Sequence, residues 1–455
     1  MEKERELILN GNIRKLLFKF SLPATVGLIV SALYNVVDTL YVGNAIGSLA
    51  IAGLAIVMPL QILIFAIGFM IGAGSGSIIA RSLGKNDRQR AEITAGNAII
   101  LTVAIGLTTM LTCYLFLDKI IYFFGASPDI FSYAKDYMSI ILIGFIFLSF
   151  DVVGNNIIRA EGKPRAAMYP LIIGAVLNII LDPVFIFALK MGVKGAAIAT
   201  VISQFISMIY IFIYFNSGKS IYKTRRVNFK LNFPLMIEII KIGFPSFLMS
   251  IVDSVIFILF NRSLVKFGND IYIAVMRIAI RIMDLTLMPL IGIMQGYSTI
   301  TGFNYGAKNF KRVKIVLKEA VIWTTIISGL SFLIIFGFPG FLLGIFSKDS
   351  EMIKMGIVPF RIISSTFITL GIQFVGGNLF QAIGKPLPAL ILNIARQVIF
   401  LIPAIIIFPK FFGLNGIWLS LPFSDILSTI LCIIFIAYEI KVINKMQLEH
   451  QIKGL

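Results

Sequence analysis

Residues 32–43, ALYNVVDTLYVG, end the first long apolar segment of the chain and carry one carboxylate, Asp38. About twenty mostly apolar residues precede Asp38, which is the length needed to cross a bilayer. An ionisable group at membrane depth is costly unless a partner compensates it, so such residues usually mark functional sites. The stretch therefore predicts a membrane-spanning helix with a functional carboxylate.

The composition of the whole chain supports a membrane protein. Of its 455 residues, 58% are hydrophobic and 14% are charged, whereas soluble domains average about 25% charged residues. The net charge is +18, but most Lys and Arg residues fall in the two termini and in the even-numbered connections between apolar segments. This positive-inside pattern predicts a multi-pass protein of a bacterial-type cell membrane with both termini in the cytoplasm. It accounts for the charge without a nucleic-acid partner.

Twelve apolar segments are long enough to span a bilayer as helices. They are residues 15–43, 48–80, 93–117, 132–158, 166–189, 195–215, 235–265, 271–303, 312–338, 352–381, 387–409 and 413–438. The sequence therefore predicts an all-α polytopic membrane protein with twelve transmembrane helices.

The two halves of the chain repeat at a constant offset in numbering, +222, which pairs Pro23 with Pro245. At the same offset AEGKPRAA (160–167) matches AIGKPLPA (382–389). Six spans per half give both halves the same orientation, which predicts two lobes related by a parallel repeat around a central cavity. We expect an N-lobe at 1–215, a cytoplasmic linker at 216–232 and a C-lobe at 233–455.

Pro23 and Pro245 lie early in the first helix of each half. Proline frees a backbone carbonyl and bends a helix. The two positions are therefore hinge candidates, and permanent packing kinks are the alternative.

The halves differ in the acidic residues inside their spans. Asp38 and Asp182 of the first half become Phe260 and Ala404 at +222, so an acid-based function would reside in one lobe. Asn178 is four residues before Asp182, on the same helix face. Thr200 is expected at a similar depth. Such oxygens suit a small hard cation or a shared proton, and helix packing is the alternative.

The second half carries charges of both signs inside its spans. Arg281 and Asp284 are three residues apart, which predicts an ion pair on one helix face. The alternative is that Asp253 or Asp284 faces the cavity and attracts cationic substrates. The candidate substrate-cavity residues are Tyr34, Asp253, Asp284 and Arg281.

No arrangement of residues indicates an enzyme or a cofactor. The only histidine, His450, lies in the C-terminal tail, and Cys113 and Cys432 fall in separate spans. No nucleophile–base pair, metal cluster or phosphate-binding loop stands in a usable place.

Five motifs resemble the multidrug and toxic compound extrusion (MATE) family over essentially the whole chain. They are YNVVDTLYVG (34–43), RAEGKP (159–164), LNIILDP (177–183), GAAIAT (195–200) and GFNYGAKN (302–309). The resemblance implies a two-lobed, V-shaped antiporter that exports organic, cationic drugs or toxic compounds against inward flow of H⁺ or Na⁺ by alternating access.

Carried over by motif, the family's cation-coupling site falls on residues of the first lobe. They are Asp38, Asn178, Asp182, Thr200 and Asn155, and Na⁺ would bind the first four. NorM-type members have an acid in the tenth span, whereas this span has only Glu351 at its boundary and Gln373 within it. The pattern therefore resembles the DinF-like or MepA-like branch. We expect a monomer.

A lipid-linked oligosaccharide flippase of the same superfamily is the alternative function. Those proteins tend to have more spans or an arginine-lined cavity for pyrophosphate. Arg277, Arg281, Arg361 and Arg396 support this alternative, whereas the Asn178/Asp182 motif and the count of twelve spans favour the exporter.

Overall fold

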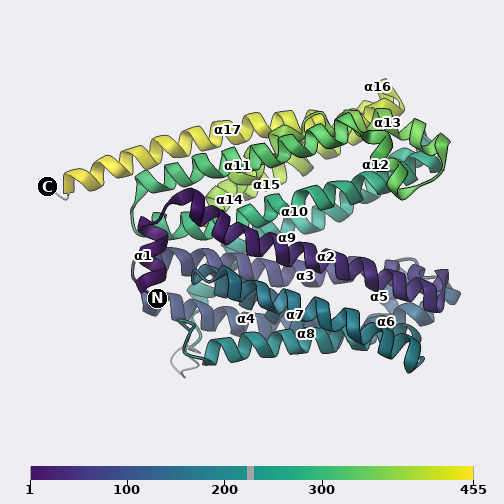
Figure 1. The fold of residues 1–455 in the computed structure, drawn as a ribbon, viewed down its shortest axis with the longest axis horizontal. Coiled ribbons are helices and arrows are strands. Elements are labelled where there is room, and N and C mark those ends of the chain that lie inside the picture. Colours follow the sequence, from purple (N-terminus) through teal and green to yellow (C-terminus); the bar gives the residue numbers. More distant parts are fainter. Residues whose placement is uncertain (1, 223–229, 454–455) are drawn as a thin grey trace. The chain divides into compact units, whose positions relative to one another are not determined.

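The computed structural model describes residues 2–222 and 230–453, which form helices joined by short connections (Figure 1). The first half contains α1 (Glu2–Asn10), α2 (Ile13–Ile46), α3 (Ser48–Gly84), α4 (Arg88–Leu115), α5 (Leu117–Phe123), α6 (Pro128–Ala160), α7 (Pro164–Pro183) with the π-helix η1 (Val184–Ala188), and α8 (Gly192–Asn216). The second half contains α9 (Phe233–Phe267), α10 (Asp270–Gly306), α11 (Phe310–Gly337), α12 (Pro339–Phe346), α13 (Ser350–Ser364), α14 (Phe367–Ala382), α15 (Pro386–Ile394), the π-helix η3 (Ala395–Leu401), α16 (Ile402–Phe412) and α17 (Leu414–Lys453).

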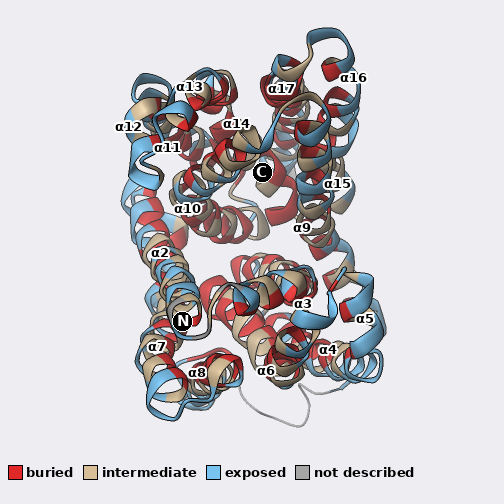
Figure 2. Ribbon diagram, turned by 90° about the vertical axis from the view of Figure 1, so that its right-hand side faces the viewer, coloured by how far each residue is buried: buried red, intermediate tan, exposed pale blue. Residues whose placement is uncertain are grey.

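The helices have the length and composition of a multi-pass membrane protein. Within the described residues, ten are long and apolar enough to cross a membrane, or eleven if the bent pair α13–α14 counts as one span. The 37-residue helix α10 completes the predicted twelve. Large apolar side chains are exposed on the outer faces, including Leu115, Phe123 and Phe411, as a lipid environment requires. Figure 2 shows buried residues mainly where helices face one another.

The helix boundaries confirm the internal repeat. Adding 222 to the first and last residue numbers of α3 gives those of α10, and the same holds for α4 and α11. The continuous helix α6 corresponds to α13 and α14 together, which meet at a 44° bend. Side-chain hydroxyls of Ser364 and Ser365 bond back to carbonyls of the preceding turn, a pattern that bends helices.

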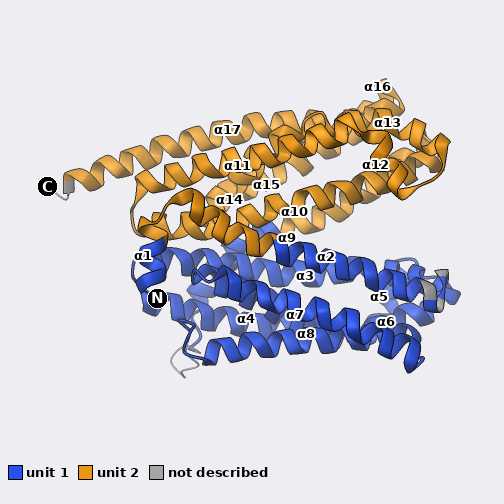
Figure 3. Cartoon of the chain, viewed as in Figure 1, with its two compact units in different colours: residues 1–7, 26–247 blue, residues 8–25, 248–455 orange. Residues whose placement is uncertain are grey.

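The chain divides into two compact units whose boundaries lie inside α2 and α9 (Figure 3). Unit 1 contains residues 1–7 and 26–247, and unit 2 contains residues 8–25 and 248–455. The start of α2 therefore belongs with the second half, and the start of α9 with the first. The lobes expected at 1–215 and 233–455 differ from the units at these segments. The expected linker, 216–232, includes 223–229, which lie outside the described residues.

Small residues allow the exchanged helix starts to pack closely. In unit 1, a Cβ on Gly74 of α3 would lie 2.0 Å from the carbonyl oxygen of Ile239 in α9, and one on Gly243 would lie 1.8 Å from that of Met70. The repeat-related contact in unit 2 joins Gly296 of α10 to Ser21 of α2. Glycine at these positions lets two helix backbones touch.

The N-terminal segment of unit 2 is held by α11. Arg312 donates to the carbonyl oxygens of Ile8 (3.1 Å) and Gly11 (2.7 Å). Arg14 and Glu319 form an ion pair at 2.9 Å. These bonds hold the start of α2 against α11, and they do not involve the rest of α2.

Glu161, in the turn between α6 and α7, holds the segment that follows α8. Its carboxylate accepts hydrogen bonds from the Ser220 hydroxyl, the Ile221 amide (3.2 Å) and the Tyr214 hydroxyl (3.4 Å). Only 1% of Glu161 is exposed. Burial raises the pKa of this carboxyl from 4.5 to about 7, because a charged group loses hydration when buried.

Candidate functional site

The C-terminal end of α7 places an amide and a carboxylate on one face. Asn178 Nδ2 donates to Asp182 Oδ1 and to Thr200 Oγ1 of α8, each at 3.3 Å. Asn178 and Asp182 are four residues apart, so their side chains meet along the helix. Pro183 follows, and the chain continues as the π-helix η1, a helical irregularity that often occurs at functional sites.

Asp38 of α2 joins this group from another helix. Its carboxyl group lies within hydrogen-bonding reach of the Asp182 carboxyl. A hydrogen bond between two carboxyl groups requires a proton on one of them, because two carboxylates only accept. The structure therefore brings together four of the five predicted residues, Asp38, Asn178, Asp182 and Thr200.

Three buried oxygens of this group have no hydrogen-bond partner among the described residues. They are Asp38 Oδ1, Asn178 Oδ1 and Asp182 Oδ2. Asp182 is 0% exposed and Asn178 is 1% exposed. A buried acceptor without a donor is unfavourable, and a bound cation or proton would satisfy it. Carboxylate, amide and hydroxyl oxygens are suitable ligands for a hard cation.

Two tyrosines lie close enough to the carboxylates for electrostatic interaction. Tyr34 of α2, predicted as a substrate-cavity residue, is near both Asp38 and Asp182. Tyr137 of α6 is near the same carboxylates and accepts a hydrogen bond from Gln61 of α3 at 3.4 Å. Neither Tyr137 nor Gln61 was predicted from the sequence. Gln61 could have been noticed as a polar residue within a span, whereas nothing distinguished Tyr137 from a core tyrosine.

Asn155 was predicted to belong to the cation-coupling site, but the structure places it away from the oxygens of Asp38 and Asp182. Its amide donates to the carbonyl oxygen of Ala167, near the start of α7. Ala167 precedes Asp182 by 15 residues of continuous helix, a rise of about 22 Å. The side chain of Asn155 is therefore too far from Asp182 to share a cation with it.

The repeat does not reproduce this site in unit 2. At +222, the counterparts of Asp38, Asn178, Asp182 and Thr200 are Phe260, Phe400, Ala404 and Pro422. Phe260 and Ala404 are each 2% exposed and pack in the core. The oxygen cluster is therefore specific to unit 1.

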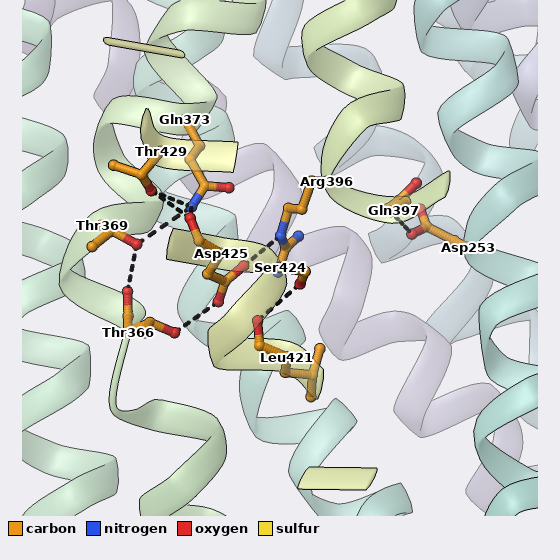
Figure 4. A network of polar contacts seen from close by, with 10 residues as sticks. All are labelled: Asp253, Thr366, Thr369, Gln373, Arg396, Gln397, Leu421, Ser424, Asp425 and Thr429. Atoms are coloured by element: carbon orange, nitrogen blue, oxygen red, sulfur yellow. Dashed lines mark hydrogen bonds and ion pairs between the residues drawn. The ribbon is translucent and has the colours of Figure 1, made fainter. Parts of the chain in front are cut away.

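Unit 2 instead contains a buried ion pair (Figure 4). Arg396 Nε and Asp425 Oδ1 are 2.7 Å apart, and only 2% of the Asp425 side chain is exposed. The Thr366 hydroxyl, at the bend between α13 and α14, donates to Asp425 Oδ2 at 2.9 Å. Gln373 donates to the Asp425 carbonyl at 3.0 Å and to the Thr429 hydroxyl at 2.9 Å. Gln373 therefore ties α14 to α17.

The π-helix η3 also connects this network to α9. Gln397, next to Arg396, donates to Asp253 Oδ1. Asp253 lies close enough to Arg396 and Asp284 for electrostatic interaction. Arg281 interacts electrostatically with Asp284, and Asp253, Asp284 and Arg281 are all exposed. The predicted substrate-cavity residues of the second half therefore form one group of charges in unit 2.

The two hinge candidates lie where their helices pass between units. Pro23 precedes the boundary after residue 25, and Pro245 precedes the boundary after residue 247. Each proline is inside one continuous helix.

A duplicated bundle of membrane-spanning helices with ionisable residues inside the spans is the architecture of secondary transporters. The MatE family model matches residues 23–184 and 245–406, two segments related by the same offset as the repeat. The chain belongs to the MATE family.

Curated and solved relatives cover nearly the whole chain. Multidrug export protein MepA of Staphylococcus aureus (strain MSSA476) is 26% identical over 93% of this chain and 93% of its own. A crystal structure of a MATE protein in the bent conformation superposes with a TM-score of 0.92, at 26% identity, over 98% of this chain and 99% of that one. The outward-facing conformation of a multidrug resistance MATE family transporter gives a TM-score of 0.91 at 26% identity, over 96% and 98%.

Proposed function

We propose that this protein exports organic compounds by alternating access, in exchange for inward flow of H⁺ or Na⁺. Family membership and the relatives named as multidrug export proteins support export. The observation that carries the coupling is the set of three buried, unpartnered oxygens on Asp38, Asn178 and Asp182.

The same oxygens account for either coupling ion. A proton bound between Asp38 and Asp182 makes their carboxyl–carboxyl hydrogen bond, and Na⁺ replaces it with coordination that Asn178 and Thr200 complete. Binding removes the repulsion of two buried carboxylates. It thereby changes how firmly α2 is held against α7.

The prolines link this event to movement of the helices. The part of α2 that follows Pro23 carries Asp38 and belongs to unit 1, whereas the part that precedes it belongs to unit 2. A change at Asp38 therefore bends α2 about Pro23, where a backbone hydrogen bond is missing. Pro245 gives α9 the equivalent freedom.

Each unit offers groups that suit an organic cation. In unit 2, Asp253 and Asp284 attract its positive group, and in unit 1, Tyr34 offers an aromatic face. The protein acts as a monomer in a bacterial-type cell membrane. Both of its termini lie in the cytoplasm, in agreement with the distribution of Lys and Arg.

Ethidium efflux from proteoliposomes under separately imposed Na⁺ and pH gradients tests this function. Efflux driven by one of the two gradients is expected. Equal rates with and without both gradients would show that the protein does not couple ion flow to export.

A lipid-linked oligosaccharide flippase is the second candidate, because Arg277 and Arg281 are exposed on α10. Binding of a lipid pyrophosphate that disappears in a double Arg277→Ala, Arg281→Ala variant, without any dye efflux by the wild type, would favour it.

A further inference from the structure

One face of α10 carries three exposed charges in a row. Arg277, Arg281 and Asp284 are spaced by four and three residues, so they lie on the same side of the helix. The opposite side packs into the core of unit 2 through Met276, Ala279, Ile282, Leu290 and Ile293. The charged face is therefore turned away from the packed interior of its own unit.

This face cannot border the lipid tails. Asp284 is 14 residues from the start of a 37-residue helix, which is about 21 Å along its axis. Charged side chains at such depth face protein or water because contact with hydrocarbon is too costly. If the proposed function holds, the water-filled space beside α10 is the substrate pathway.

The two arginines have free hydrogen-bonding capacity. Neither Arg277 nor Arg281 forms a hydrogen bond or a close ion pair with any described residue, and the interaction of Arg281 with Asp284 is longer-ranged. By contrast, Arg396 is bonded to Asp425 at 2.7 Å. A guanidinium group that has no protein partner favours a carboxylate, to which it can form two parallel hydrogen bonds.

The order of charges along α10 defines the complementary ligand. Positive groups lie at Arg277 and Arg281, and negative groups lie at Asp284 and at Asp253 nearby. Arg277 and Asp284 are seven residues apart, a rise of about 10 Å, which a small aromatic drug can span. A molecule with one anionic and one cationic group complements both ends, whereas a simple cation matches only one.

We propose that Arg277 and Arg281 bind the carboxylate of a zwitterionic organic substrate, whose positive group lies toward Asp284 and Asp253. This inference rests on the proposed export function and narrows its substrate class. The two arginines are specificity-determining residues and take no part in ion coupling.

Rhodamine B and its ethyl ester form a probe pair, because both keep the cationic ring system and the ester has an ethyl group in place of the carboxylate charge. Their binding to the protein in phosphatidylcholine nanodiscs is measured by fluorescence anisotropy. We expect the wild type to bind rhodamine B about tenfold more tightly than the ester. The Arg277→Gln, Arg281→Gln variant is expected to lose this preference while it still binds the ester.

Two further variants separate recognition from misfolding. Asp284→Asn removes a carboxylate that faces the positive group of both dyes, so it is expected to weaken the binding of both and to keep the preference for rhodamine B. Arg361→Gln removes an exposed charge of unit 2 that stacks on Phe336 and is expected to keep the preference. Equal affinities of the wild type for the two dyes would overturn the proposal but not the export function.

The remaining outcomes also decide the proposal. If the wild type binds neither dye, the proposal is overturned, and ethidium efflux then decides the export function separately. If the preference disappears in phosphatidylglycerol nanodiscs, lipid headgroups occupy the arginines and the proposal is overturned.

Discussion

The carboxyl group of Asp38 in α2 lies within hydrogen-bonding reach of the carboxyl group of Asp182 in α7. These residues are far apart in the sequence and belong to unit 1. Asn178 and Thr200 complete a group of oxygens, of which three are buried without a donor in the part of the chain that the structure describes. In the proposed function a bound proton or cation stabilises this arrangement, and its occupancy controls how α2 is held.

Neutralising either partner of the ion pair in unit 2 is expected to destabilise the protein, and by different amounts for Arg396 and Asp425. Arg396→Gln leaves the buried Asp425 carboxylate with only the Thr366 hydroxyl, and removing one partner of a buried pair costs about 3–5 kcal/mol. Asp425→Asn costs less because Arg396 can still interact with Asp253. Thermal unfolding in detergent measures both variants. A larger loss for Asp425→Asn would contradict this account.

The contact between α3 and the start of α9 is expected to tolerate no side chain at Gly74. A Cβ there would lie 2.0 Å from the Ile239 carbonyl oxygen, and overpacking typically costs about 1–3 kcal/mol. Gly76 is the matched control, because the nearest atom to its Cβ would be 3.6 Å away. Gly74→Ala should lower the unfolding temperature, and Gly76→Ala should leave it unchanged or raise it. Equal effects would mean that this contact does not limit packing.

Ionisation of Glu161 is expected to weaken the protein as the pH rises. Its pKa is about 7 in the folded protein and 4.5 in the unfolded chain. Between pH 4.5 and about 7, Glu161 is therefore protonated in the folded state and ionised in the unfolded state. The contribution of Glu161 to the free energy of unfolding is fully present below pH 4.5 and is lost as the pH rises to about 7.

Glu161→Gln removes this dependence and retains a carbonyl oxygen for Ser220 and Ile221. At pH 8 the variant should be more stable than the wild type, on the order of 3 kcal/mol, and the difference should shrink toward pH 5. Unfolding temperatures at both pH values measure it. A variant that is less stable by the same amount at both pH values would show that Glu161 is folded in its charged form.

Much of the fold follows from the sequence because membrane-spanning helices have a strong signal. The internal repeat is visible from Pro23 and Pro245, and the helix ends of α3 and α10 confirm it. The exchange of helix starts between units was not predictable, because hydropathy does not indicate which bundle a helix end contacts. The bend at Thr366 was also missed, since the repeat predicts a straight helix like α6.

The candidate site was predictable where motif spacing fixes geometry. Asn178 and Asp182 share a face because they are four residues apart. The pairing of Arg396 with Asp425 depends on two helices meeting, so the sequence showed the charges but not their contact. Asn155 was misplaced because its position along α6 does not reveal which end of α7 it touches.

Ion-driven dye export by Asp38→Asn shows whether Asp38 couples ion flow to export. The variant keeps the size of the side chain and removes the charge that makes ion binding necessary. Asp151→Asn is the matched control, since Asp151 is another carboxylate of unit 1, on α6, with an unpartnered Oδ1. Efflux from proteoliposomes under an imposed H⁺ or Na⁺ gradient is compared for the three proteins. We predict that Asp38→Asn loses gradient-driven efflux by about 10-fold or more while Asp151→Asn retains it, and undiminished efflux by Asp38→Asn would contradict the assignment of Asp38 to ion coupling.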